Sequence, residues 1–309
     1  MSISSRIRGA LLGLAAGDAL GTTLEFKPPG SFAPIADMIG GGPFGLEPGQ
    51  WTDDTSMALC LAESLVETGG FDAADQMRRY IRWYRNGHHS STGSCFDIGN
   101  TVRAALKRFE VDGDVGNSGL RDTYSAGNGS LMRLAPVPLF FRTDPARAVT
   151  MSGDSSKPTH AHPEAVDACR YFAGLIVGAL QGRSKDELLQ PLFSPSPDRK
   201  PFVAPIERVA GGSFLRLEPP DIRGTGYVTA SLEAALWAFA KSTSFEDGAL
   251  LAVNRGDDAD TTGAVYGQIA GAYYGVDGIP ERWLAKLAHR DTIEQLATQI
   301  ASQAPDGVR

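Results

Sequence analysis

Two short acidic clusters, one near each end of the sequence, limit how this chain can fold. Residues 52–55 read TDDT and residues 257–261 read DDADT, and each cluster stands where an apolar, Ala-rich helical pattern begins. Taken separately, each is typical of a helix N-terminus, because Asp and Thr cap helices and complement the helix dipole. Taken together, matched Asp and Thr at two helix starts favour one shared site with four or five carboxylates.

Such a site needs positive charge, because buried carboxylates destabilise a protein unless they are paired or neutralised. The available ligands are all oxygens, and these suit one or two hard divalent cations such as Mg²⁺ or Mn²⁺. Zinc would require His or Cys at short spacing. The pairs His88–His89 and His160–His162 have no second ligand pair at zinc spacing. The sequence therefore predicts a magnesium or manganese site.

Composition narrows the class of protein further. The net charge of −7 gives no general attraction to nucleic acid or to anionic membranes. The three cysteines are widely separated and fit free thiols in a reducing cytosol better than a disulfide framework. No segment approaches the ~20 apolar residues of a membrane span, and the N-terminal run lacks the cleavage site of a signal peptide. We expect a cytoplasmic protein that does not associate with membranes.

Helical periodicity dominates the sequence and predicts an all-α fold. Strand signals are weak, and segments such as residues 202–205 and 213–217 are candidates for short hairpin pieces. They lie in a Pro/Gly-rich region, residues 182–226, which reads as a linker or as a loop insertion. We prefer the insertion, within a single domain of residues 1–309, because the two acidic clusters flank this region. Helices are expected at residues 7–20, 55–66, 72–85, 97–109, 163–180, 228–241, 245–253, 260–274, 280–287 and 291–302.

Glycine is frequent inside these helical patterns, although it costs about 1 kcal/mol relative to Ala in a helix. Its use predicts close approach of helices or access to a ligand. Glycines also flank Asn128, and the apolar residues that follow are expected to begin a helix with Arg133 in its first turn. Amide groups at a helix start can bind phosphate, and a plain tight turn is the alternative. Asp97 also stands at the start of an expected helix, where capping is the alternative to a catalytic role.

These motifs, in this order, resemble the ADP-ribosylglycohydrolase family. The resemblance covers most of the chain, and the ordered set of motifs is far more specific than any one of them. It is carried by residues 13–21 with Glu25, 52–55, 97–101, 126–133, 159–163 and 254–275.

The resemblance implies a compact multi-helix fold and a hydrolase with two divalent cations, Mg²⁺ or Mn²⁺. The enzyme would cleave the glycosidic bond between ADP-ribose and an acceptor, with protein arginine as the favoured acceptor. An ADP-ribosylated protein would be the substrate and ADP-ribose the product, with no membrane partner and nucleic acid disfavoured by the net charge.

The resemblance also implies roles for individual residues. Asp97 and Gly99 would face the scissile bond or its ribose, the turn at Gly127–Ser130 would hold the diphosphate, and Tyr227 would cover the adenine. The implied catalytic residues are Asp97, Glu25 and Asp258. The implied metal ligands are Thr52, Asp53, Asp54, Asp258, Asp260 and Thr261. The implied substrate contacts are Gly99, Asn100, Gly127, Asn128, Gly129, Ser130, Met132, His160 and Tyr227.

Two alternatives remain open from the sequence. The same chemistry could act on serine-linked ADP-ribose, on O-acetyl-ADP-ribose or on a modified nucleobase. A non-catalytic ADP-ribose-binding or structural protein would be expected to have lost metal ligands, whereas all six matched positions hold Asp or Thr. The chain departs from the family pattern at Asp257, where many relatives carry Gly. This residue would either add an acid beside the metals or contact the metal ligands without binding a metal itself.

Overall fold

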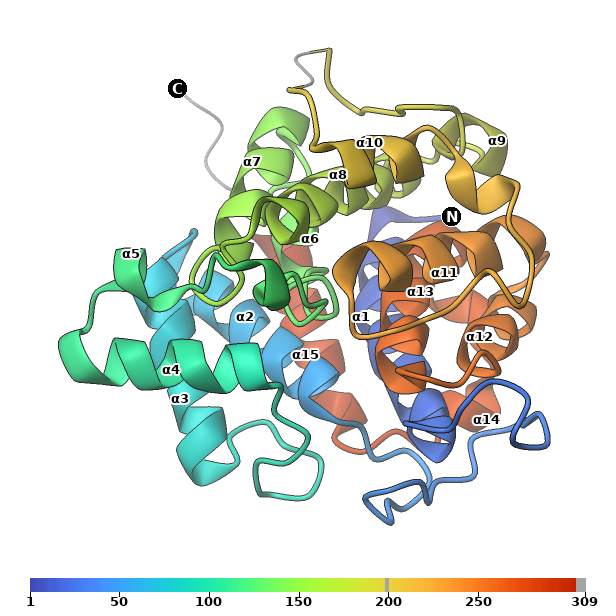
Figure 1. The fold of residues 1–309 in the computed structure, drawn as a ribbon, viewed down its shortest axis with the longest axis horizontal. Coiled ribbons are helices and arrows are strands. Elements are labelled where there is room, and N and C mark those ends of the chain that lie inside the picture. Colours follow the sequence, from blue (N-terminus) through green and yellow to red (C-terminus); the bar gives the residue numbers. More distant parts are fainter. Residues whose placement is uncertain (198–199, 304–309) are drawn as a thin grey trace.

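Helices supply nearly all the regular structure of the chain (Figure 1). The computed structural model describes residues 1–197 and 200–303, and β-structure within them is limited to isolated bridges. The predicted all-α fold is therefore confirmed. The α-helices are α1 Ile3–Gly21, α2 Asp53–Thr68, α3 Ala73–Asn86, α4 Asn100–Asp112, α5 Val115–Ser118, α6 Pro136–Phe140, α7 Pro145–Ser156, α8 Pro163–Leu180, α9 Lys185–Leu188, α10 Ala204–Ala210, α11 Val228–Lys241, α12 Phe245–Val253, α13 Ala259–Tyr274, α14 Glu281–Leu284 and α15 Arg290–Ser302. The 3₁₀ turns are η1 Thr22–Leu24, η2 Thr123–Ser125, η3 Ser213–Leu215 and η4 Val276–Gly278.

Each of the ten expected helices is present, but several further helices were not expected. Helix α7 begins with Pro145, and the side chain of Asp144 accepts a hydrogen bond from the amide of Arg147. That Asp-Pro start is a readable signal, since Asp caps helices and Pro favours their first turn. The hairpin candidates were wrong, because residues 204–210 form α10 and residues 213–215 form a 3₁₀ turn.

The segment after Asn128 also differs from its prediction. Residues 129–133 form turns, and the next helix, α6, starts only at Pro136. Arg133 therefore does not lie in the first turn of a helix. Consecutive hydrogen bonds from Leu131 and Met132 to the carbonyl of Asn128 close the turn instead.

Helices α1 and α13 lie side by side at the centre of the fold (Figure 1). A Cβ added at Gly17 would lie 2.0 Å from the carbonyl oxygen of Gly263, and one added at Gly267 would lie 1.9 Å from that of Gly13. The two backbones are thus in direct contact, which no residue larger than Gly permits. The expectation that glycine marks close helix approach is confirmed here.

The direction of this contact determines where the two acidic clusters lie. Gly9 contacts Gly271, whereas Gly21 contacts Ala259, so the helices run antiparallel. The C-terminal end of α1, which carries Asp18, therefore meets the N-terminal end of α13.

The remaining helices pack around this pair. Helices α11 and α12 pack against α13, α8 packs on α7 and α13, and α15 lies against α1 and α2. Among the described residues, no helix combines the length and the apolar character that crossing a bilayer would require.

We predict that Gly17→Ala destabilises the protein by about 3 kcal/mol or more, because its methyl group would overlap the backbone of α13. Chemical denaturation measures the free energy of unfolding. Gly70→Ala is the matched control, since a Cβ there meets no atom within 4 Å. A Gly17→Ala protein as stable as the control would contradict the backbone contact.

Candidate active site

A cavity of about 410 Å³ opens where the starts of α2, α4 and α13 meet the turn that follows η2. Thirteen of the sequence-predicted site residues line it. These are Glu25, Asp53, Asp97, Gly99, Asn100, Gly127, Asn128, Gly129, Met132, His160, Asp258, Asp260 and Thr261.

The start of α2 is capped by a carboxylate from another helix. Asp18 Oδ1 accepts hydrogen bonds from the amide and the hydroxyl of Thr52, at 2.9 and 3.0 Å. Its Oδ2 accepts from the amide and the hydroxyl of Thr55, at 3.0 and 2.6 Å. Thr52 itself makes no capping bond with its side chain. The side chains of Asp53 and Asp54 are therefore not needed to cap their own helix.

The start of α13 is capped in the same way. Glu25 Oε2 accepts hydrogen bonds from the amides of Ala259, at 2.8 Å, and Asp260, at 3.3 Å. Asp258 occupies the N-cap position but makes no capping bond with its side chain. Asp18 and Glu25 thus provide the caps at the starts of both helices, in addition to the bond from the amide of Thr261 to Asp260 Oδ1, at 2.6 Å. Capping therefore does not account for Asp53 and Asp54, whose carboxylates are left to face the second cluster.

The two clusters converge in space. Asp54 Oδ2 lies 3.2 Å from the hydroxyl oxygen of Thr52 and 3.4 Å from that of Thr261, so it joins the two clusters directly. Two groups of carboxylate oxygens lie within 4.8 Å of one another and share Asp260: Asp18–Asp54–Asp260 and Glu25–Asp258–Asp260. Asp54 Oδ1 and Asp260 Oδ2 are buried without a hydrogen-bond partner.

Seven carboxyl groups gather here without a cation from the protein. In the described part of the chain, no salt bridge involves any of them. The oxygen donors and the two unpartnered oxygens suit hard divalent cations. Asp18 is the least available, because its oxygens already accept four hydrogen bonds. The seven are Asp18, Glu25, Asp53, Asp54, Asp97, Asp258 and Asp260.

Burial and mutual repulsion make these groups hard to ionise. Burial raises the pKa of Asp18 to about 6, despite its four hydrogen bonds. Burial and then the charge of Asp258 raise the pKa of Glu25 to about 8. The pKa values of Asp53, Asp54 and Asp260 are raised well above the ordinary range, first by burial and then by neighbouring carboxylates.

Asp97 lies in a strained loop instead of capping α4. Its φ of 57° is in the left-handed region, which is uncommon for a residue other than Gly, and α4 begins only at Asn100 with Gly99 as its N-cap. The capping alternative is therefore excluded. Burial raises the pKa of Asp97 to about 7, partly offset by a side-chain hydrogen bond with Asp260. The cavity wall therefore carries a carboxyl group whose pKa is close to neutral pH, which suits proton transfer.

The glycine turn also lines the cavity. Asn128 donates from its amide to Gly226, at 3.1 Å, and from Nδ2 to Asp258 Oδ2, at 2.7 Å. The turn is thereby joined directly to the acidic clusters. The His160 ring packs against Gly129, and burial, together with the charge of Arg133, lowers its pKa to about 3.

Four predicted site residues do not line the cavity. Thr52 and Asp54 lie behind its wall, buried, where they contact Asp18 and Thr261. Ser130 accepts a hydrogen bond from the hydroxyl of Ser156, at 2.8 Å. Tyr227 points its hydroxyl at Glu164 and has 43% of its surface exposed, so it does not cover the cavity here.

Two aromatic residues that the sequence did not single out do line the cavity. Phe26 follows Glu25, and Tyr124 precedes the glycine turn, with 97% of its surface exposed. Their proximity to motif residues was the only available signal.

Asp257 does not add an acid to the site. Arg223 donates to both of its carboxylate oxygens, at 2.9 and 2.7 Å. Its carbonyl accepts from the amide of Phe26, and its amide donates to the carbonyl of Lys27. Asp257 thus fixes the loop that carries Glu25.

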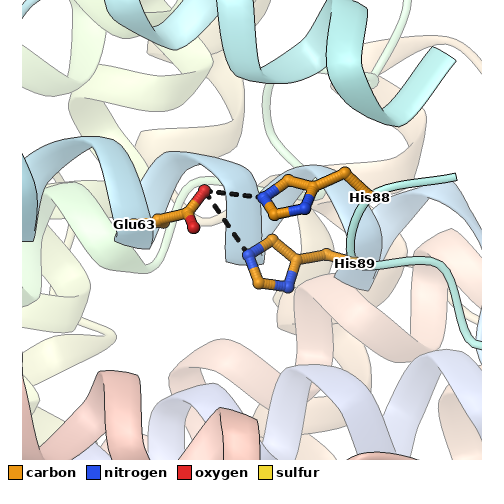
Figure 2. Close-up of side chains that lie close together, drawn as sticks. All are labelled: Glu63, His88 and His89. Atoms are coloured by element: carbon orange, nitrogen blue, oxygen red, sulfur yellow. Dashed lines mark hydrogen bonds and ion pairs between the residues drawn. The ribbon is translucent and has the colours of Figure 1, made fainter. Parts of the chain in front are cut away.

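A separate cluster of metal-binding residue types lies between α2 and the loop after α3 (Figure 2). His88 and His89 direct Nε2 toward Glu63 Oε2, at 2.7 and 3.6 Å. The sequence gave no sign of it, because Glu63 is distant from both histidines along the chain. Arg79 Nη1 lies 2.5 Å from the same carboxylate oxygen. With that positive charge already in place, the cluster fits an ion-pair network better than a metal site.

Comparison with known proteins agrees with this geometry. The family model described as ADP-ribosylglycohydrolase matches residues 1–307. The chain belongs to the ADP-ribosylglycohydrolase family. It is 43% identical to the ADP-ribosylarginine hydrolase Tri1 of Serratia proteamaculans, over 97% of this chain and 80% of that protein. It is 33% identical to the ADP-ribosyl-[dinitrogen reductase] glycohydrolase of Rhodospirillum rubrum, over 93% of this chain and 91% of that protein.

A solved structure supports the fold of this ADP-ribosylglycohydrolase. A chain of an "ADP-ribosylglycohydrolase-related protein complex" superposes with a TM-score of 0.85 at 45% identity, covering 98% of this chain and 99% of that one. Family membership makes the protein a hydrolase of ADP-ribosyl linkages.

We predict that the chelator-treated protein loses stability as the pH rises from about 5 to about 8. A carboxyl group with a raised pKa binds its proton more tightly in the folded chain than in the unfolded chain. The resulting destabilisation is absent below the unfolded pKa of about 4 and grows towards the folded pKa values of about 6 to about 8.

Thermal unfolding in EDTA across this pH range measures the effect. Asp54→Asn should flatten the slope because it removes one buried carboxylate, and Asp257→Asn should not because that group pairs with Arg223 outside the cluster. A melting temperature that rises with pH would contradict the crowding of carboxylates.

Proposed function

We propose that the protein is a metal-dependent hydrolase that releases ADP-ribose from ADP-ribosylated arginine in proteins. The observation that carries the proposal is the convergence of two distant acidic clusters on one cavity that a glycine turn suited to phosphate also lines. The arginine acceptor is supported by two relatives named ADP-ribosylarginine hydrolase, which are 43% and 45% identical to this chain.

The residues present fit two divalent cations, Mg²⁺ or Mn²⁺. The donors are carboxylate and hydroxyl oxygens, and Asp54 Oδ1 and Asp260 Oδ2 are buried without any other partner. When bound, the cations would offset the clustered negative charge, orient the substrate and increase the acidity of bound hydroxyl groups. The proposed ligands are Thr52, Asp53, Asp54, Asp258, Asp260 and Thr261.

The substrate would lie along the cavity between these residues and the turn. The Gly127–Ser130 turn would hold the diphosphate through its backbone amides, because those of Gly129 and Ser130 have no backbone acceptor in the described chain. Asp97 and Gly99, at the start of α4, would then face the ribose and the scissile bond. Tyr124, one of the two aromatic residues that line the cavity, would contact the adenine.

The reaction breaks the bond between the anomeric carbon and the guanidine nitrogen and forms a bond from that carbon to a water oxygen. Asp97, with its pKa near 7, would accept a proton from the attacking water. The departing guanidine is a strong base and would receive that proton. Glu25 would hold the start of α13, and with it Asp258 and Asp260, at the cavity wall.

We also propose that residues 1–309 act as one domain in the cytoplasm. One cavity uses side chains from both ends of the sequence, and the three cysteines are free thiols.

Asp54→Asn and Asp258→Asn should each lower the rate of ADP-ribose release by at least about 100-fold, since each removes a charged ligand. Release from arginine-modified protein is measured with Mg²⁺, with Mn²⁺ and in EDTA. Asp257→Asn serves as the control and should retain most activity. Full activity of either variant, or of chelated enzyme, would reject the scheme, and serine-linked and O-acetyl substrates test the acceptor.

Asp97→Asn should bind ADP-ribose with nearly wild-type affinity but lower the turnover number by about 10²–10⁴-fold, because the amide cannot accept a proton. Calorimetry gives the affinity, and single-turnover kinetics give the rate of bond cleavage. Unchanged turnover would remove Asp97 from the chemistry.

A further inference from the structure

Arg133 is a buried cation with no carboxylate partner. Its side chain is fully buried, and no salt bridge among the described residues involves it. Nη1 donates to the carbonyl of Gly129 at 2.6 Å, Nη2 donates to Thr159 Oγ1 at 2.7 Å, and the guanidinium lies 4.7 Å from the centre of the Tyr80 ring. A buried charge without a counter-ion is costly, so its position directly behind the glycine turn calls for an explanation.

Thr159 connects this cation to a histidine. Its Oγ1 lies 2.9 Å from Nδ1 of His160, and Thr159 is fully buried. Because the guanidinium has only donors, Thr159 Oγ1 must accept from Arg133, and its single hydrogen is free to point at Nδ1. If Nδ1 carried a hydrogen instead, the buried hydroxyl hydrogen of Thr159 would have no acceptor. The arrangement that satisfies every group leaves Nδ1 bare and puts the imidazole hydrogen on Nε2.

The Nε2 side of this ring faces the glycine turn and the cavity. A Cβ added at Gly129 would lie 3.2 Å from His160 Nε2, and one added at Gly127 would lie 3.5 Å from it. His160 lines the cavity beside both glycines. Burial and the charge of Arg133 lower its pKa to about 3, so the ring is neutral at working pH.

We propose that Arg133 and Thr159 are positioning residues that fix His160 as a neutral imidazole with its hydrogen on Nε2, which donates to a diphosphate held at the turn. The inference rests on the proposed function for its ligand. The opposite tautomer would direct a lone pair at the phosphate oxygens and repel them. Arg133 itself adds a fixed positive charge at the turn through its bond to the carbonyl of Gly129, whereas Asn128 of the same turn contacts Asp258.

This arrangement answers a problem that the site creates. An anionic diphosphate must bind at a turn whose Asn128 contacts Asp258, within reach of several carboxylates. A buried cation acts strongly on an anion through a medium of low dielectric constant. His160, as a neutral donor, and Arg133, as a buried cation, therefore both attract the diphosphate. An exposed cation in the cavity would instead be bound by the nearby carboxylates.

The tautomer is measured on the full-length protein from the ¹⁵N chemical shifts of its imidazoles. His160→Gln identifies the relevant signals among the five histidines of the chain. In the wild type we expect a hydrogen on Nε2 and none on Nδ1 between about pH 6 and pH 8, where an ordinary histidine titrates. This measurement does not depend on the folding of any variant of Arg133 or Thr159, which together form the relay to His160.

Thr159→Val removes the hydroxyl while keeping the shape of the side chain. Without that hydroxyl, the hydrogen of His160 should no longer be confined to Nε2. The variant should bind ADP-ribose about tenfold more weakly and have a higher KM, with kcat changed by less than about threefold. Thr159→Ser, which restores a hydroxyl, should return the shifts and the affinity towards wild type. Thr150→Val is the control, because its hydroxyl bonds only within α7 and is remote from the relay.

The outcomes separate this inference from the proposed function. Wild-type protein that binds ADP-ribose but carries the hydrogen on Nδ1, or an imidazolium, would overturn the relay alone. An unchanged tautomer and affinity in Thr159→Val would do the same. Wild-type protein that fails to bind ADP-ribose while showing the expected tautomer would overturn the proposed function and, with it, the proposed ligand of His160.

Discussion

The direct backbone contact between α1 and α13 is the constraint on which the rest of this structure depends. Glycines at Gly9, Gly13 and Gly17 allow the two helices to approach until their carbonyl groups face bare Cα atoms. That closeness fixes their antiparallel register. The last turn of α1 must therefore lie beside the first turn of α13, and the site is built at this junction.

This junction also changes which residues cap the helices. Asp18 and Glu25, one in α1 and one just past η1, satisfy the amides at the starts of α2 and α13. Asp and Thr residues that would ordinarily cap those helices are released to face one another. A set of carboxylates is thereby concentrated, at a cost in repulsion that divalent cations would offset.

The glycine turn at the cavity is held by a buried positive charge. Arg133 supports the glycine turn from behind and, through Thr159, contacts His160. In the proposed function, the acidic clusters would hold the cations and the amides and neutral donors of the turn would hold the phosphates. A substrate with both a ribose and a diphosphate would suit that division.

The sequence by itself located ten of the helices and indicated a site with oxygen ligands. Periodicity located α8 and α11 to the residue because it is a local signal, and each Asp and Thr cluster is likewise a short local motif. Only the tertiary structure decided which carboxylates cap helices, that Asp257 pairs with Arg223, and that Tyr124 lines the cavity in place of Tyr227. Those outcomes depend on contacts between residues far apart in the chain, which no local pattern encodes.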